Sequence, residues 1–289
     1  MSGELKKDVM CAVSHYPHVE NGEASDVVVR SGDDVYVVIA EDDLNKVNRK
    51  RAGSTTMLAK GIGGKALIVA ERAGNEGLLD EVVYEKYGLP AVNLETFVQM
   101  LKGRKVFIRK KKSVYVVSIN PYKLRKLREE NRISLGALAD YLGVSRKSVY
   151  EYERGRSKVS VDVAVKLAEL FGDEILEPVD LDEFKGVRME VGPHTELEAE
   201  VLESVDNTVH VPKGKVSVGG TVEDKEFSAL VPHGKRDELE WFAELSKVVD
   251  RLTVAIGFKD VPKELEESKV EVVRDLQQFF RLLKSGEEC

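Results

Sequence analysis

Short apolar runs alternate along this chain with stretches in which apolar residues recur every three or four positions. The runs predict β-strands, and the spaced stretches predict amphipathic helices. Before residue 102 the expected elements are helices at 4–16, 42–60, 84–88 and 94–101, and strands at 27–30, 35–40, 66–70 and 91–92. Residues 105–109 and 114–119 then predict a hairpin around the basic run 110–112. Strands and helices in alternation indicate an α/β domain over residues 1–118.

The middle of the chain shows only the helical spacing. Leu138, Ala139 and Leu142 repeat at helical intervals and predict one short helix. Gly143 follows, where a tight turn requires a positive φ or the absence of a Cβ atom. Ser145 then stands where a hydroxyl oxygen would accept hydrogen bonds from the free N–H groups of a second helix.

The second helix has two different faces. Val149 and Tyr152 predict its buried edge, and its outward positions are Arg146, Lys147, Ser148, Tyr150 and Glu151. A further amphipathic helix at 160–171 begins with a serine cap and is expected to bury Val163, Leu167 and Leu170. Two short helices, a glycine turn and a polar outer edge describe a helix-turn-helix (HTH), which lays its second helix in the DNA major groove.

A corner between two helices of any bundle would also give a helix–glycine–helix pattern. DNA binding is favoured because the turn has the required length, a third helix follows, and the outward face is basic and hydroxyl-rich. Residues 121–158 carry 10 Lys and Arg against 5 Asp and Glu, whereas residues 179–289 carry 15 against 25. Basic charge is therefore concentrated where phosphates can attract it, and the acidic C-terminal part should be repelled by DNA.

The central segment resembles the HTH domains of the phage repressor and Cro class, often called the XRE class. The resemblance rests on the pattern LRxLREENxxS–LxxLAxxLGVSRxSVxxYExG. In its long flanks, the whole chain is also similar to archaeal HTH-type transcriptional regulators that embed such a domain centrally. The class usually carries Gln in the first turn of its second helix to bind phosphate. Here Leu135 and Gly136 occupy that turn, so Ser134 and backbone amides remain for the contact.

The resemblance implies how DNA is contacted. Base edges are expected to be read mainly by Arg146, Lys147 and Glu151. The positions that typically face phosphates are Ser145, Ser148, Arg154, Arg156 and Lys158. Because one such domain reads about half a site, we expect a homodimer on a palindromic operator in double-stranded DNA. In the same class, an Arg of the first helix pairs with a Glu that ends the recognition helix, and the matching residues are Arg128 and Glu153.

The C-terminal part repeats the order of elements seen at the start of the chain. The expected elements are helices at 195–205, 236–249, around Glu264 and at 276–283, and strands at 216–222, 227–231, 252–256 and 270–273. Either the two α/β segments are a duplication, or any α/β layer gives similar strings; the pattern leaves both open. The expected division is 1–118, 119–178 and 179–289, with α/β domains flanking an all-α, lambda-repressor-like domain.

The first α/β segment also resembles the restriction-endonuclease-like nuclease fold, through its αβββαβ order and through Asp26 before the first hairpin. Such nucleases need an Asp and, on the next strand, Glu-x-Lys, to hold Mg²⁺ and to poise a water. The strand at 35–40 contains no acid or lysine, and Glu41 and Asp42 beyond its end suit a helix start better. We therefore expect a degenerate relative of that fold, and not an enzyme.

Two other functions stay open beside a DNA-binding regulator. The chain is alternatively a transcription coactivator or adaptor whose HTH binds protein or RNA. The remaining alternative is an inactive nuclease relative. DNA binding with its salt dependence tests the first of these, and a metal-dependent cleavage assay tests the second.

The sequence contains a few weaker candidates for phosphate, zinc or redox sites, but no cofactor or metal site is expected. Gly61–Lys65 has the composition of a phosphate loop, but the expected helix precedes it, so a helix C-cap explains it better. His15 and His18 are near neighbours, but zinc needs four ligands. Cys11 is a candidate redox sensor, although a buried helix cysteine is favoured. The basic run 110–112 is better explained by a solvated hairpin tip than by a phosphate contact.

Composition sets the remaining limits. The 289 residues are 42% hydrophobic and 33% charged, as expected of a soluble protein with two or three globular domains. The sequence contains no run of 18 apolar residues, and its N-terminus is too polar for a signal peptide. Cys11 and Cys289, near opposite ends, predict no disulfide framework. We expect a cytoplasmic protein without a membrane span.

Overall fold

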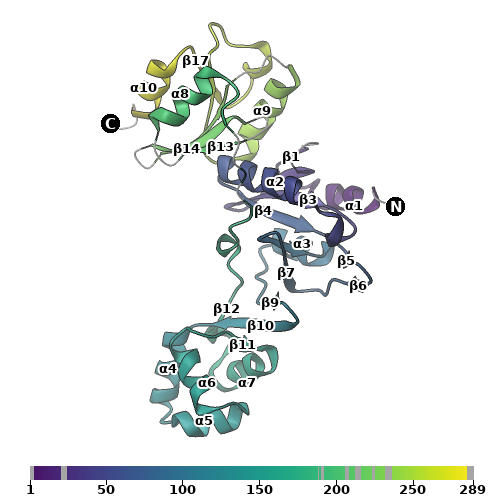
Figure 1. Cartoon of the computed structure of the whole chain (residues 1–289), viewed down its shortest axis with the longest axis vertical. Helices are drawn as coiled ribbons and strands as arrows, with labels where there is room; N and C mark the ends of the chain where they lie inside the picture. Colours follow the sequence, from purple (N-terminus) through teal and green to yellow (C-terminus); the bar gives the residue numbers. More distant parts are fainter. Residues whose placement is uncertain are drawn as a thin grey trace. The chain divides into compact units, whose positions relative to one another are not determined.

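The computed structural model of the chain describes residues 3–20, 25–187, 189, 192–205, 208–211, 216–222, 225–231 and 236–284 (Figure 1). Cys289 lies outside the described residues. The chain forms two compact units: residues 1–77, 86–90 and 184–289 make the first, and residues 78–85 and 91–183 make the second. None of the described helices is both long and apolar enough to cross a lipid bilayer.

The first unit begins with an α/β layer. Its elements are α1 (Glu4–Val13), β1 (His18–Glu20), β2 (Val27–Ser31), β3 (Asp34–Ala40), η1 (Leu44–Lys46), α2 (Arg49–Ile62), β4 (Lys65–Val69), β5 (Arg72–Ala73) and β6 (Glu76–Gly77). Strands β1, β2 and β3 are antiparallel neighbours, and β4 pairs with β3 in parallel after the crossover through α2. Leu67, Ile68 and Val69 are fully buried, as the apolar run predicted.

The helix predicted to start at Asp42 starts later. Asp43 accepts a hydrogen bond from the backbone N–H of Asn45 (3.0 Å) and begins only the short η1 turn. Val47 is extended, and Asn48 then caps α2 by accepting from the N–H of Arg51 (2.9 Å). Two successive polar caps therefore divide the segment that was predicted as one helix into η1 and α2.

A second α/β layer of the first unit lies in the C-terminal part. Its elements are α8 (Glu196–Ser204), β13 (Val209–His210), β14 (Val218–Val222), β15 (Lys225–Leu230), α9 (Arg236–Val248), β16 (Leu252–Ile256), η4 (Lys263–Leu265), β17 (Val270–Val273) and α10 (Leu276–Lys284). The sheet order is β13-β14-β15-β16-β17, with β13 to β15 antiparallel and β15 to β17 parallel.

The two layers have the same strand order. β1-β2-β3-β4 in the first corresponds to β13-β14-β15-β16 in the second, with a helix before each and the crossover helix at the same place. The hairpin registers also agree. The pair Val27–Val38 of β2 and β3 corresponds to the pair Val218–Ala229 of β14 and β15, and each pair is separated by the same number of residues along the chain. This is the outcome that the duplication hypothesis required.

One side-chain contact is repeated as well. In this register Asp26 corresponds to Ser217, and Ala40 to Val231. The Asp26 carboxylate accepts from the backbone N–H of Ala40 (2.8 Å), and the Ser217 hydroxyl accepts from the N–H of Val231 (3.0 Å). The same backbone group is therefore satisfied by a different side chain in each layer.

The two layers pack on each other reciprocally. Helix α2 of the first layer contacts β13 and β14, and α9 of the second layer contacts β1 and β2. Gly61 of α2 and Gly219 of β14 approach so closely that a Cβ on Gly219 would overlap the Gly61 backbone. Ser228 donates to the Gly61 carbonyl (2.8 Å), and Trp241 donates to that of Glu20 (2.7 Å). Residues of both layers thus share one apolar core.

The second unit starts with short elements that lead into the helices. They include most of β7 (Val82–Lys86), part of β8 (Leu89–Val92), α3 (Leu94–Leu101), β9 (Ile108–Lys111) and β10 (Val114–Ile119). The predicted helix at 84–88 is wrong, because this segment is the end of one strand and a turn. Tyr87 and Gly88 have φ values of 52° and 71°, and two successive positive φ values form the type of turn that joins hairpin strands.

The rest of the second unit is the predicted helical bundle. It comprises α4 (Pro121–Glu130), α5 (Leu135–Leu142), α6 (Arg146–Glu153), β11 (Val159–Ser160), α7 (Val161–Phe171), η2 (Asp173–Ile175), β12 (Leu176–Glu177) and η3 (Leu181–Glu183). Val163 and Leu167 are buried as predicted, but Leu170 is exposed. Phe171 is buried instead, because it lies two turns beyond Val163 on the inner face of α7.

Candidate nucleic-acid interface

The turn between α5 and α6 has the geometry that the sequence predicted. Ser134 caps α5 by accepting from the N–H of Ala137 (3.0 Å). Gly143 ends α5 with φ 74°, in the left-handed region. Ser145 caps α6 by accepting from the N–H of Ser148 (3.0 Å). Local hydrogen bonds therefore fix both ends of the turn, and Val149 and Tyr152 anchor α6 in the core.

The outward side of α6 presents several side chains to solvent. Arg146, Lys147 and Tyr150 are exposed. The hydroxyls of Ser145 and Ser148 are hydrogen-bonded to each other (2.9 Å). Two cations and two hydroxyls are thus gathered at the N-terminal end of the helix, where its backbone N–H groups also carry partial positive charge.

The residues around the C-terminal end of α6 make weak polar contacts. The Arg154 guanidinium lies 4.8 Å from the ring centre of Tyr150. Glu151 and Arg156 are 3.8 Å apart, and Lys158 lies 3.5 Å from Glu183. These long, partly exposed ion pairs can exchange for contacts with a nucleic acid at small cost.

Gly136 in the first turn of α5 makes room for Arg146 of α6. A Cβ on Gly136 would lie 2.8 Å from both Nε and Nη2 of Arg146, so the guanidinium rests directly on the glycine. The departure from the usual Gln of the class thus has a structural counterpart. An exposed guanidinium occupies the space that a longer side chain on α5 would enter.

The predicted ion pair between Arg128 and Glu153 is confirmed. Arg128 Nε donates to Glu153 Oε1 (2.5 Å) and Nη2 to Oε2 (3.1 Å), and the two side chains are 11% and 7% exposed. Arg128 also donates to the carbonyl of Ile133 (3.0 Å). The bond to Glu153 raises the pKa of Arg128. The pair ties the end of α4 to the end of α6 and so holds α6 in place.

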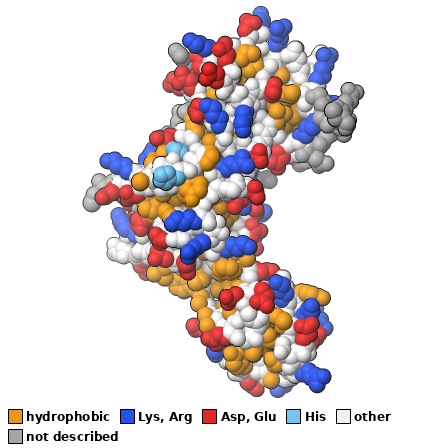
Figure 2. Space-filling view, turned by 180° about the vertical axis from the view of Figure 1, so that it is seen from behind, with side chains coloured by type: hydrophobic (Ala, Val, Ile, Leu, Met, Phe, Trp, Pro, Cys, Tyr) orange, Lys and Arg blue, Asp and Glu red, His pale blue; other side chains and the backbone are white. Residues whose placement is uncertain are grey.

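The remaining surface has no comparable arrangement on the face that Figure 2 shows. Lys and Arg are interspersed there with Asp and Glu instead of forming one basic field. A mixed surface fits the negative net charge of the whole chain, −7.

The position that corresponds to a nuclease centre is filled by cations. Asp26 at the start of β2 is held by Arg51 Nη2 of α2 (2.5 Å) and by Lys6 Nζ of α1 (3.1 Å). Glu41 is the other nearby acid, 3.9 Å from Arg51. In the second layer, Ser217 takes the place of Asp26. The described residues contain no group of three or more His, Cys, Asp and Glu that could hold a metal ion, and the carboxylates of Asp26 and Glu41 both face Arg51.

The other candidates from the sequence are resolved by their local structure. Gly63 (φ 66°) caps the end of α2 and donates to the carbonyls of Ala59 and Lys60, so Gly61–Lys65 is a helix end, as favoured. Cys11 is exposed and not buried as expected. The buried face of α1 consists of Leu5, Val9 and Val13, and Cys11 lies off that line.

The basic hairpin and the two near-neighbour histidines are also placed. Lys110 lies over the rings of Tyr84 (5.2 Å) and Tyr115 (5.6 Å), while Lys111 and Lys112 are exposed at the hairpin tip. The His18 ring is hydrogen-bonded to the carbonyl of Tyr16 (2.9 Å). His15 is exposed, and Lys111 and Lys112 stand at the hairpin tip that the sequence predicted.

Capped helices around a glycine turn, an exposed basic edge and a buried Arg–Glu tie define a helix-turn-helix protein of the DNA-binding class. Comparison with known families agrees. The "Helix-turn-helix" family matches residues 124–175, and the "PD-(D/E)XK superfamily domain" family matches residues 5–106. The second match supports the resemblance of the first α/β layer to a nuclease fold.

Relatives that cover most of the chain carry one name. A "Putative HTH-type transcriptional regulatory protein" of Aeropyrum pernix is 43% identical over 58% of this chain and 52% of its own length. The "Putative HTH-type transcriptional regulatory protein PF1851" of Pyrococcus furiosus is 35% identical over 84% of each chain. The chain belongs to this family of archaeal HTH-type transcriptional regulatory proteins.

Among solved structures, the restriction-modification controller protein C.AhdI from Aeromonas hydrophila is 30% identical. The match covers 22% of this chain and 88% of that protein, with a TM-score of 0.17. A score this low supports no comparison of the folds.

Proposed function

We propose that this chain is a sequence-specific transcriptional regulator that reads the DNA major groove with the helix Ser145–Arg154. The observation that carries the proposal is the side of α6 that bears Arg146 and Lys147. Both cations are exposed, and the caps and the tie to Arg128 hold their helix rigidly. A rigid helix with unshielded cations at its start suits recognition of base edges between two phosphate backbones.

The proposed DNA contacts fall into two groups, those to base edges and those to phosphates. Arg146, Lys147 and Glu151 read base edges, with Tyr150 beside them. Residues at the borders of the helix bind phosphates: Ser134, Ser145, Ser148, Arg154, Arg156 and Lys158. Glu151 and Arg156 then exchange their long mutual contact for DNA.

The operator is palindromic and is bound by a homodimer, because one recognition helix covers about half a site. The protein works in the cytoplasm, where the DNA is. The α/β domains at 1–118 and 179–289 serve as scaffold for the HTH domain at 119–178. They do not catalyse, because the ion pairs of Asp26 take the carboxylate that a nuclease would offer to a metal.

A gel-shift assay with genomic fragments tests the proposal. We expect one or a few fragments to bind far more tightly than the rest, with an affinity that falls as salt rises. Equal weak binding of all fragments would contradict sequence-specific regulation. The same fragments incubated with Mg²⁺ should remain intact, and metal-dependent cuts would show that a flanking domain is catalytic.

A further inference from the structure

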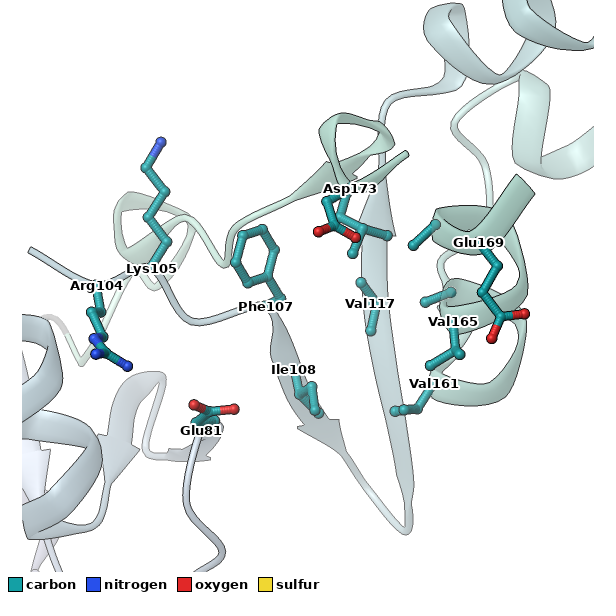
Figure 3. A pocket seen from close by; sticks show the side chains of 13 residues that line it. Glu81, Arg104, Lys105, Phe107, Ile108, Val117, Val161, Val165, Glu169 and Asp173 are labelled. Carbon is teal, nitrogen blue, oxygen red and sulfur yellow. The ribbon is translucent and has the colours of Figure 1, made fainter. Parts of the chain in front are cut away.

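A groove of about 700 Å³ lies within the second unit, beside the helical bundle (Figure 3). One wall is the segment that leads into β9, together with β10, and the other wall is α7. Phe107, Ile108 and Val117 line the first wall, and Val161 and Val165 line the second. Val165 is 51% exposed, so α7 presents an apolar side chain to solvent at the edge of the groove.

Charges of opposite sign stand on opposite sides of this groove. Arg104 and Lys105 lie on the first wall and Glu169 lies on α7, while Asp173 of η2 lies between Phe107 and α7 (Figure 3). None of these four makes a side-chain hydrogen bond or ion pair with another described residue. Glu81 also lies on the basic side and reduces the charge there, but Lys105 points away from it.

We propose that the groove is the surface on which a second copy of this chain docks, with a two-fold axis between the two walls. Such an axis brings the basic wall of each copy over the acidic wall of the other. The apolar floor and Val165 then become the buried centre of the interface, and the four charges become its rim. The proposal rests on the proposed function and names the surface that sets two recognition helices on one operator.

Two features favour a second copy over another occupant. The reciprocal packing of α2 and α9 means that the paired surfaces of the α/β layers are already used within one chain. The described lining of the groove also contains no buried polar side chain that would orient a small ligand; its charged residues, Glu81 included, are exposed at the rim. A self-complementary rim around an apolar floor matches a copy of itself.

Sedimentation velocity of the full chain tests the interface. We expect the wild type to be a dimer and Val165→Lys to raise the dimer dissociation constant by roughly tenfold or more, because a charge enters the buried centre. Val114→Lys is the matched control, since Val114 is 57% exposed at the β9–β10 hairpin. It should leave the constant unchanged. A monomeric wild type, or a Val165→Lys variant that dimerises like the wild type, would overturn the proposal.

Charge reversal tests the two-fold arrangement. Lys105→Glu and Glu169→Lys should each weaken the dimer, because each places like charges opposite one another across the axis. The double variant should restore it, since both pairs are then reversed together. A double variant weaker than either single one would show that these walls do not face each other.

DNA binding distinguishes failure of the interface from failure of the function. Val165→Lys should still bind a short duplex of arbitrary sequence at low salt as the wild type does, because α6 is untouched. If the wild type binds no duplex under any condition, the proposed function fails, while sedimentation velocity still tests whether the groove is the dimer interface. If peptides or small molecules fill the groove of a wild type that stays monomeric, the second copy is the wrong occupant.

Discussion

At the scale of single residues, Arg146 is the side chain on which the proposed reading of DNA by α6 depends most. Its guanidinium rests on Gly136 and has no protein partner among the described residues. An arginine held in this way loses little conformational freedom on binding, and its planar fork suits the two acceptors of guanine.

We predict that Arg146→Ala costs roughly 1–3 kcal/mol on the preferred site and relaxes the base preference there. Arg156→Ala is the comparison, because it should weaken all sequences alike and reduce the salt slope by about one unit. Binding titrations on a duplex with the preferred site and on a scrambled duplex, at several salt concentrations, measure the loss of affinity and the salt slope of both variants. Unchanged specific binding by Arg146→Ala would show that the docking is wrong.

Gly136→Ala tests the support that the glycine gives to Arg146. The added methyl group would displace the guanidinium, which is the flexible end of a side chain. Stability should hold or rise by about 0.5–1 kcal/mol, because Ala is the better helix residue. Specific affinity should fall. A variant that melts higher and binds equally well would mean that the resting place of Arg146 is irrelevant to DNA.

At the scale of elements, the bundle depends on one buried pair more than on surface charges. Arg128 and Glu153 join the ends of two helices that are separated by α5, and both side chains are largely shielded from water. Removing one partner leaves the other charge buried without compensation.

We predict that Glu153→Ala destabilises the helical bundle by about 3–5 kcal/mol. Glu129→Ala is the matched control, because Glu129 also contacts Arg128 but is 52% exposed, and it should cost less than about 1 kcal/mol. Thermal melts followed by circular dichroism measure both. If the two variants melt alike, the buried pair has no special role.

The helical elements were predictable from the sequence because their determinants are local. The caps Ser134, Ser145 and Ser160 and the turn at Gly143 lie within a few residues of the helices they end. The helix predicted at 84–88 is wrong because the segment is the end of β7 and the turn into β8, and this turn requires a positive φ at Tyr87, which the sequence does not signal for a tyrosine. The contact of the Arg146 guanidinium with Gly136 could not be predicted from the sequence either, because side-chain rotamers depend on packing.

At the scale of the whole chain, the two α/β layers of the first unit behave as one body. Helix α2 of the first layer packs on the sheet of the second, and α9 of the second packs on the sheet of the first. The two backbones are in contact at Gly61 and Gly219. The sequence suggested the repeated order of elements, but it could not show this contact, because two glycines far apart in the chain form it.

We predict that Gly219→Ala destabilises both layers together, by about 1–3 kcal/mol or more, because the new methyl would strike backbone that cannot rotate away. Urea unfolding with hydrogen exchange on residues of each layer measures the effect. Gly3→Ala, with nothing within 4 Å of its new Cβ, is the control. Loss of protection in only one layer would show that the two fold independently.

The strands that bracket the helical bundle lie side by side. Ser118 pairs with Glu177 and Ile119 with Leu176, so the chain enters the bundle and leaves it through neighbouring strands. A segment whose two ends meet in this way can be exchanged for another with equally close ends without stretching its host. The segment between residues 119 and 176 therefore has the geometry of a replaceable unit, and we expect a hybrid that carries the corresponding segment of a relative to keep β10 and β12 paired.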